Sequence, residues 1–206
     1  MINRQFFFEQ VRATLFTGKL TTKQVTGLTG ILDEWEARHA TWDDRWLAYA
    51  LATTFHETAF TMQPIHERGG NDYFFRMYDK DSPVPARRAV AKRLGNTQPG
   101  DGVLFHGRGF VQLTGRANYT RMGTIFGVDL TTNSSAADAV LGLSMASRIM
   151  FKGMHEGLFT GARFATFFND TKTDWVNARK IINRLDVADA IAQYGRKFYA
   201  ALSHTT

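Results

Sequence analysis

The stretch Trp46-Leu47-Ala48-Tyr49-Ala50-Leu51-Ala52-Thr53-Thr54-Phe55 runs for ten residues without a charge and leads directly into His56-Glu57-Thr58. Its residues favour a helix that begins near 41–44, where Thr and Asp side chains are suited to capping. A helix that is apolar nearly all round has no face suited to water. We therefore expect this helix in the middle of the fold, with Glu57 at its C-terminal end.

The chain on either side of this helix is also predicted to be mainly helical. Apolar residues follow helical spacing over residues 4–17, which Gly18 ends, and from Thr21 or Thr22 to Arg38. The inner stripe predicted for the second of these helices is Val25, Leu28, Ile31, Leu32 and Trp35. Further helices are predicted at 118–126, 134–152, 173–183 and 186–202, the last with Val187, Ile191, Tyr194, Phe198 and Ala201 on its inner face.

Residues 64–109 differ from the rest, because they are rich in Gly, Pro, Asp and Asn. They predict loops and turns with one short helix at 85–94. The segment 110–113 is too short to assign. The fold class expected is all-α or nearly so, as a single catalytic domain over 1–206. Helices within about 1–40 would pack on a core of about 41–204, with the active surface on the irregular middle segment.

Composition narrows the class of protein. The 206 residues contain 25 Lys and Arg against 19 Asp and Glu, a net charge of +6 that suits an anionic polymer or simple solubility. The absence of Cys excludes disulfides, zinc–cysteine sites and thiol nucleophiles. Neither a signal-peptide core nor a membrane-spanning run is visible, so we expect synthesis in a cytoplasm. Nucleic acid is not an expected partner, because no basic stripe alternates with stacking aromatic residues.

Two glutamates are the candidate catalytic groups. Glycosidic bond cleavage uses two carboxyl groups that flank the bond, one of which protonates the leaving oxygen. Glu57 follows an apolar helix, where a carboxylate is costly unless it is paired; the alternative is a helix-end side chain in solvent. Glu67 lies ten residues on, and its alternative is a loop carboxylate paired with Arg68.

The three histidines near these glutamates offer a weak metal site. His56-Glu57 begins a zinc motif, but Phe60 occupies the position of the second histidine, and the motif fails. The remaining candidate for a metal site is a cluster of His56, His66 and His106, although their spacing in the sequence does not favour one. We expect neither a metal nor a cofactor.

The stretch from Phe105 to Tyr119 is the most informative loop. Gly107 and Gly109 bracket Arg108, whose planar guanidinium is suited to holding a carboxylate. Polar groups suited to sugar hydroxyls or water follow at Gln112, Thr114 and Asn118. A phosphate-binding loop is the competing interpretation, although its Gly-Lys-Ser/Thr ending is absent.

Four blocks in this order resemble glycoside hydrolase family 19, which contains plant-type chitinases and phage endolysins. They are His56-Glu57-Thr58, Leu94-Gly95-Asn96, the stretch from Gly107 to Thr114 with Asn118-Tyr119, and Arg179-Lys180-Ile181-Ile182-Asn183. The resemblance covers roughly residues 45–200. It implies a lysozyme-like helical fold of two lobes with a substrate cleft and an inverting mechanism.

The resemblance also implies roles for individual residues. Glu57 matches the general acid, Glu67 the base and Thr114 the residue that places the attacking water. Positions that line or support the sugar groove are matched by His56, Arg108, Gln112, Asn118, Tyr119 and Asn183. The short gap between the glutamates and the lack of Cys are closer to endolysins than to chitinases. Arg184-Leu185 replaces the usual Gly-Gly, and Ala190 replaces a carboxylate-binding arginine, which would leave that role to Arg108 alone.

The function expected is therefore a peptidoglycan muramidase of the endolysin type, monomeric, acting in the periplasm or cell wall after release through a holin pore. A chitinase would use the same two glutamates. A non-catalytic glycan-binding or virion structural protein is the alternative from another class. The C-terminal helix carries Arg184, Arg196 and Lys197 beside its apolar face, which suggests weak contact with an outer membrane.

Overall fold

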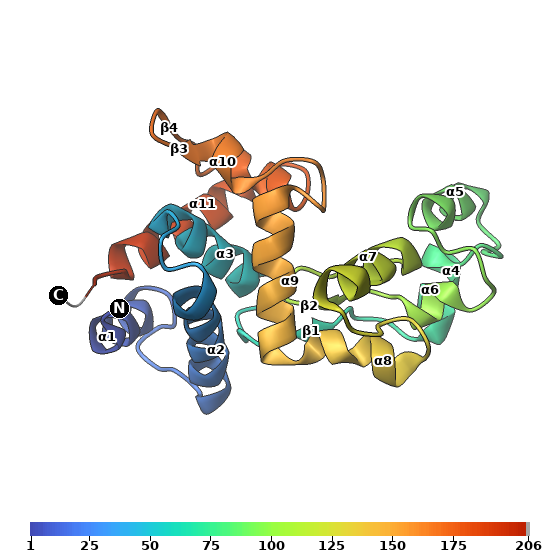
Figure 1. The fold of residues 1–206 in the computed structure, drawn as a ribbon, viewed down its shortest axis with the longest axis horizontal. Helices are drawn as coiled ribbons and strands as arrows, with labels where there is room; N and C mark the ends of the chain where they lie inside the picture. The colour runs from blue at the N-terminus through green and yellow to red at the C-terminus, as the bar shows by residue number, and fades with distance from the viewer. Residues whose placement is uncertain (205–206) are drawn as a thin grey trace. The chain divides into compact units, whose positions relative to one another are not determined.

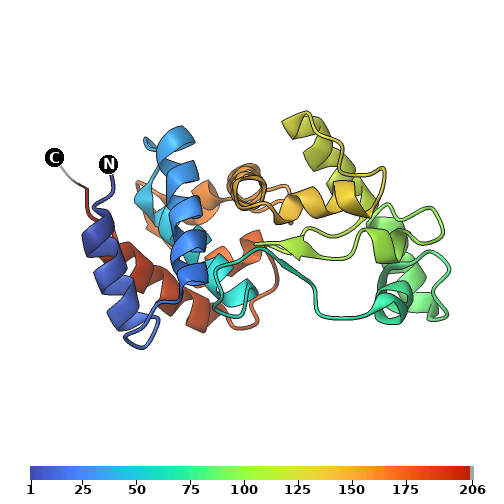
Figure 2. The same ribbon diagram turned by 90° about the horizontal axis from the view of Figure 1, so that it is seen from below.

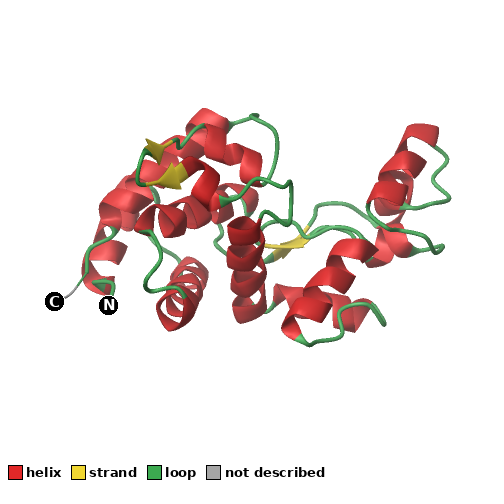
Figure 3. Ribbon diagram, turned by 45° about the horizontal axis from the view of Figure 1, so that its top comes forward, coloured by secondary structure: helices red, strands yellow, loops and turns green. Residues whose placement is uncertain are grey.

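The computed structural model describes residues 1–204 and shows a mainly helical protein, as the sequence predicts (Figures 1 and 3). The chain divides into two compact units. Unit 1 consists of Met1–Gln63 and the segment that begins at Ser147, and unit 2 is Pro64–Ala146. The elements in chain order are α1 (Arg4–Thr14), α2 (Thr22–Arg38), α3 (Asp44–Glu57), β1 (Ile65–His66), α4 (Asn71–Tyr78), α5 (Pro85–Arg93), α6 (Asp101–Leu104), β2 (Arg108–Gly109), α7 (Arg116–Phe126), α8 (Ser134–Asp138), η1 (Ala139–Leu141), α9 (Leu143–Glu156), α10 (Phe164–Phe167), β3 (Phe168–Asn169), β4 (Lys172–Thr173), η2 (Asn177–Ile181) and α11 (Ala188–Ala201).

Helix α3 lies at the centre of unit 1, which confirms the prediction from its apolar sequence. The residues from Leu47 to Ala52 are fully buried. Asp43 caps the helix by accepting a hydrogen bond from the backbone N–H of Arg45. Helix α11 packs along α3, and α1 lies beside α11 (Figure 2). Helix α3 therefore has neighbours that cover its apolar surface and fix the position of its C-terminal end.

The two N-terminal helices belong to unit 1. Helix α2 has its predicted bounds, whereas α1 ends at Thr14, three residues before the predicted end at 17. Thr21 and Gln24 form a capping box at the start of α2, in which each side chain satisfies the backbone N–H of the other residue. Gly18 follows α1 in the left-handed region at φ 86°. The predicted inner stripe of α2 is wrong at Val25, which is 37% exposed, because α2 meets its neighbours through the residues from Gly27 onward.

Unit 2 contains more helix than the sequence predicts. The helix at 85–94 is present as α5, but α4 and α6 also form within the segment expected to be loops. Asp79 connects them: it is fully buried, and its carboxylate accepts hydrogen bonds from the N–H groups of Gly100 and Gly102. A tertiary contact thus stabilises helices that are too short to be stable by propensity alone.

A short antiparallel ladder, β1 with β2, carries the polar loop of unit 2. Ile65 pairs with Gly109 and His66 with Arg108 (Figure 3). Helix α7 begins at Arg116, two residues before the predicted start, and ends at Phe126, which is followed by Gly127 at φ 67°. The ladder therefore joins the chain around Glu67 to the chain around Gly107.

Two predicted helices differ from the structure. The segment 134–152 is divided into α8, η1 and α9, because Gly142 adopts an extended backbone after η1. The segment 173–183 forms only β4 and the 3-10 helix η2. Val187 precedes α11 at φ 51° and is 47% exposed, so the inner face of α11 begins after it. Within residues 1–204, no helix is both long enough and apolar enough to span a membrane.

Candidate functional site

Glu57 is the last residue of α3 and is paired with an arginine. Arg179 Nη1 donates a hydrogen bond to Glu57 Oε1 over 2.6 Å. The side chains are 3% exposed for Arg179 and 19% exposed for Glu57. The alternative in which Glu57 turns to solvent is therefore wrong. Asp186 Oδ2 lies 3.9 Å from Arg179 Nη2.

The segment around η2 holds Arg179 in place. Asp174 accepts hydrogen bonds from the backbone N–H of Asn177 at 3.0 Å and from its side-chain amide. Trp175 is buried against Gly195 of α11, where an added Cβ would lie only 2.8 Å from the indole ring. The expectation that Arg108 alone would serve as the carboxylate-binding arginine is wrong, because Arg179 binds Glu57.

The turn after Glu57 is fixed by Thr58. Its hydroxyl donates to the carbonyl oxygen of Thr54 and accepts from the backbone N–H of Met62. Three non-glycine residues follow with left-handed φ angles, at Ala59, Phe60 and Met62. Such backbone costs free energy and is concentrated near functional sites. His56 lies half-buried just before this turn.

Glu67 follows β1 in unit 2 and is held by two donors. Tyr78 donates its hydroxyl to Glu67 Oε1 at 2.7 Å, and the backbone N–H of Gly107 donates to Oε2 at 3.2 Å. The backbone N–H of Glu67 in turn donates to the carbonyl oxygen of Gly107 at 2.8 Å. The partners of Glu67 are thus Tyr78 and Gly107, and the predicted alternative of an Arg68 ion pair is wrong. Burial, and then the hydrogen bond to Glu67, raise the pKa of Tyr78, which keeps its donor proton.

Three side chains predicted to be functional converge on Gly107. A Cβ added there would lie 2.8 Å from Gln112 Oε1, 3.0 Å from Glu67 Oε2 and 3.1 Å from Thr114 Oγ1. The first of these distances is shorter than real Cβ atoms show, and the other two are tighter than nine in ten real contacts, so a larger residue at 107 would force these three side-chain ends to shift. Thr114 donates its own proton to the carbonyl oxygen of Gln112, which leaves its oxygen free to accept one from a water.

The loop from Gly107 to Thr114 is held in place by hydrogen bonds of Arg108, Asn118 and Tyr119. Arg108 is 2% exposed and donates to Asp138 Oδ1, to two backbone carbonyl oxygens and to the hydroxyl of Tyr119. Burial raises the pKa of Tyr119 to about 12. Asn118 donates its amide to the carbonyl oxygen of Thr114 at 2.7 Å. These contacts make Arg108 and Tyr119 part of the scaffold beneath Glu67 and Thr114.

Two of the three candidate metal-binding histidines lie in contact. His106 Nδ1 donates a hydrogen bond to the carbonyl oxygen of Val103, and His106 Nε2 lies 3.0 Å from His66 Nδ1. Phe74 stacks on the His106 ring at 4.2 Å, and burial lowers the pKa of His106. Among residues 1–204, no three His, Asp or Glu side chains are grouped in a way that would hold a metal ion.

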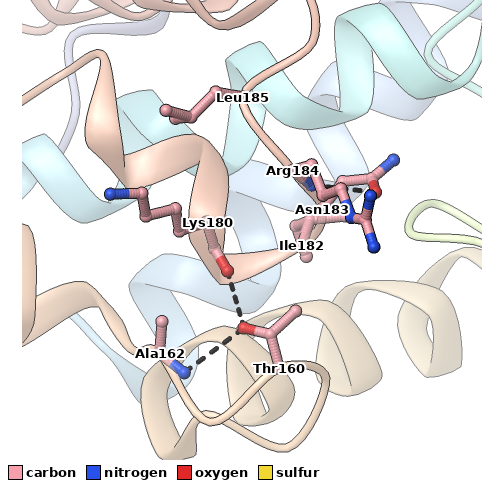
Figure 4. A pocket seen from close by; sticks show the side chains of 7 residues that line it. All are labelled: Thr160, Ala162, Lys180, Ile182, Asn183, Arg184 and Leu185. Carbon is pink, nitrogen blue, oxygen red and sulfur yellow. Dashed lines mark hydrogen bonds between the residues drawn. The ribbon is translucent and has the colours of Figure 1, made fainter.

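Asn183, the remaining predicted groove residue, lines a depression of about 650 Å³ in unit 1 (Figure 4). Its backbone N–H donates to the carbonyl oxygen of Arg179 at 3.0 Å, and Lys180, which also lines the depression, directly follows the partner of Glu57. The residues that line it are Thr160, Ala162, Lys180, Ile182, Asn183, Arg184 and Leu185.

Three residues that contact the candidate catalytic groups are not among the site residues predicted from the sequence. Arg179 lies in a block that carries the family resemblance, so a signal existed, but Asn183 was the residue chosen from that block. Gly107 also lies in a quoted motif, as a bracket for Arg108. Tyr78 lies in a segment predicted to be a loop, and nothing in the sequence pattern joins it to Glu67.

Comparisons with known proteins support the coarse class of activity. A glycosyl hydrolase family 19 domain-containing protein of Haemophilus influenzae (strain ATCC 51907 / DSM 11121 / KW20 / Rd) is 33% identical over 73 residues, which are 34% of this chain. The match spans about a third of that relative, 36% of its length. No family model matches the chain. Over this part of its length, the chain is similar to a protein with a glycosyl hydrolase family 19 domain.

Proposed function

We propose that the protein hydrolyses the β-1,4 bond between N-acetylmuramic acid and N-acetylglucosamine in bacterial peptidoglycan, with inversion at the anomeric carbon. The observation that carries this proposal is the different environment of the two carboxyl groups. Glu57 is bound by a buried arginine at a helix end, whereas Glu67 is held by neutral donors beside Thr114. Two carboxyl groups with different surroundings are what separate acid and base roles require.

Glu57 is the proposed general acid. With substrate bound, a proton carried on the Glu57 carboxyl group passes to the oxygen of the leaving sugar, and Glu57 returns to the carboxylate form that pairs with Arg179 in the free protein. Arg179, whose Nη1 lies 2.6 Å from Oε1, is placed to compensate the negative charge that this transfer creates.

Glu67 is the proposed general base. Tyr78 donates to Oε1 at 2.7 Å and Gly107 over a longer 3.2 Å to Oε2, so Oε2, which converges with Thr114 on Gly107, is the oxygen that would take a proton from the attacking water. Thr114 Oγ1 would accept the other proton of that water in a hydrogen bond, which leaves the lone pair of the water directed at the sugar. An inverting reaction requires the carboxyl groups of Glu57 and Glu67 to stand about 6.5–9.5 Å apart in the enzyme–substrate complex.

Isosteric variants test these roles. Glu57→Gln and Glu67→Gln should each lower turnover of purified peptidoglycan at least about a thousandfold, measured as released reducing ends. Glu9→Gln, which changes an exposed carboxylate, is the matched control. NMR of the first product should show the inverted anomer, and azide should restore turnover to Glu67→Gln. Full activity of either variant would refute the assignment of that residue.

The substrate is tested in parallel. Colloidal chitin presents the same β-1,4 linkage without lactyl groups or peptides, and faster release of reducing ends from chitin than from peptidoglycan would contradict the proposed substrate. Release from neither polymer would favour a non-catalytic glycan-binding protein.

We further propose that the protein acts as a monomeric endolysin on the glycan strands of the cell wall. A membrane contact through α11 would involve its exposed side, which bears Arg196, Lys197 and Tyr199, because Ile191 and Phe198 are buried in unit 1. A peptide of residues 184–202 that fails to permeabilise lipid vesicles would remove this part of the proposal.

A further inference from the structure

The depression next to Asn183 has features of a binding site that the proposed reaction does not use. Its volume of about 650 Å³ falls in the range common for sites of small ligands. Leu185 is 47% exposed on its wall, with Ile182 and Ala162 beside it. Covering an exposed leucine in a hollow with an apolar group of a ligand lowers the free energy.

The wall of this depression is held together by hydrogen bonds between two segments. Thr160 donates its hydroxyl to the carbonyl oxygen of Lys180 at 2.6 Å and accepts a hydrogen bond from the backbone N–H of Ala162 (Figure 4). Asn183 Oδ1 accepts from the backbone N–H of Arg184 at 2.9 Å. The depression is therefore built by contacts between segments twenty residues apart in the sequence.

Two cationic side chains stand at opposite ends of the depression. Figure 4 shows Lys180 extending to one side and Arg184 to the other. Within the described part of the chain, neither forms an ion pair with a carboxylate, and no acidic residue lines the depression. Both cations are exposed and free to meet an anionic ligand.

An extended ligand with small apolar groups between carboxylates would match this arrangement. The peptide stems of peptidoglycan have this chemistry, because they combine alanine methyl groups with free carboxylates. Chitin has neither. We propose that the depression lined by Lys180, Ile182, Asn183, Arg184 and Leu185 binds the peptide stem of peptidoglycan and thereby selects peptidoglycan over chitin.

The link to substrate selection rests on the proposed function, since it assumes that the same chain cleaves the glycan strand. The local geometry agrees with it. Arg179, which binds Glu57, and Asn183, which lines the depression, are joined by a backbone hydrogen bond within one turn. A stem bound here would lie beside the acid that acts on its strand.

Binding is tested first, without any need for catalysis. The full chain, labelled for NMR, is titrated with a synthetic stem tetrapeptide that has free carboxylates and with the same peptide amidated. Saturable shifts of the Thr160, Ala162 and Leu185 amides with the free acid alone are expected. The double variant Lys180→Gln/Arg184→Gln should lose them, whereas Lys23→Gln, an exposed lysine elsewhere in unit 1, should keep them. Equal shifts with the amidated peptide, or no shifts, would overturn the proposal.

Selection is tested with two substrates that differ only in the stems: intact peptidoglycan and the same strands after an amidase has removed the peptides. Each single variant should raise KM on the intact polymer about threefold and the double variant about tenfold, as expected for exposed ion pairs. The KM on stripped strands should match the wild type. A rise in KM on both substrates, or on neither, contradicts the stem site. Undiminished turnover by Glu57→Gln would instead refute the proposed function, and the peptide titration would still be interpretable.

Discussion

Replacing Arg179 by Met removes the guanidinium that contacts Glu57 and leaves a half-buried carboxylate without a partner. The pair is shielded, with 3% of the Arg179 side chain and 19% of the Glu57 side chain exposed. Removing one member of a buried pair costs about 3–5 kcal/mol, because the remaining charge stays desolvated. Glu57→Gln removes the charge itself, so in that background the loss of Arg179 should cost less. We expect a coupling free energy of about 2 kcal/mol between the two substitutions.

The assay is urea unfolding at pH 7 of the wild type, the two single variants and the double variant. The ion pair between Lys152 and Glu156, with side chains 39% and 38% exposed, provides the control cycle. That exposed pair should couple by only about 0.3–0.5 kcal/mol. If the coupling of Arg179 with Glu57 is as small as that of the control, the reasoning from burial is refuted, and with it the argument that Arg179 compensates charge on the acid.

Three further perturbations follow from the structure. Tyr78→Phe removes a hydrogen bond to the proposed base, and because hydrogen bonds to charged groups are worth about 1.5–3 kcal/mol, kcat on peptidoglycan should fall at least about tenfold. Tyr73 is an exposed tyrosine of the same helix, and the kcat of Tyr73→Phe should match that of the wild type. Gly107→Ala should lower kcat about a hundredfold by displacing the groups that crowd its Cα, whereas Gly70→Ala, with nothing within 4 Å of its added Cβ, should leave kcat unchanged. Burial, with a neighbouring histidine, lowers the pKa of His39 from 6.5 to about 4, so its contribution to stability is complete above pH 6.5 and is lost as the pH falls toward 4. In urea unfolding between pH 7 and 4, the free energy of unfolding of His39→Gln should therefore decline less steeply than that of the wild type. Parallel declines would contradict this.

The long helices could be predicted because their signals are local. The capping box at Thr21 and Gln24, the uncharged run before Glu57 and the spacing of apolar residues in α11 each involve neighbours within four residues. Helix α4 could not be predicted in the same way. Its eight residues depend on α6 and on the buried carboxylate of Asp79, which contacts residues more than twenty positions away.

The sequence by itself determined that the protein is mainly helical, that Glu57 ends a buried helix, and that a polar loop runs from Gly107 to Asn118, because helical periodicity, capping and motif order are properties of short stretches of chain. Only the tertiary structure decided the partners of the two glutamates. Arg179 reaches Glu57 across 122 residues of sequence, and Tyr78 reaches Glu67 from a helix that the sequence did not predict. Such pairings depend on packing between distant elements. A buried charge is costly unless a partner compensates it, but the position of that partner leaves no periodic pattern in the sequence.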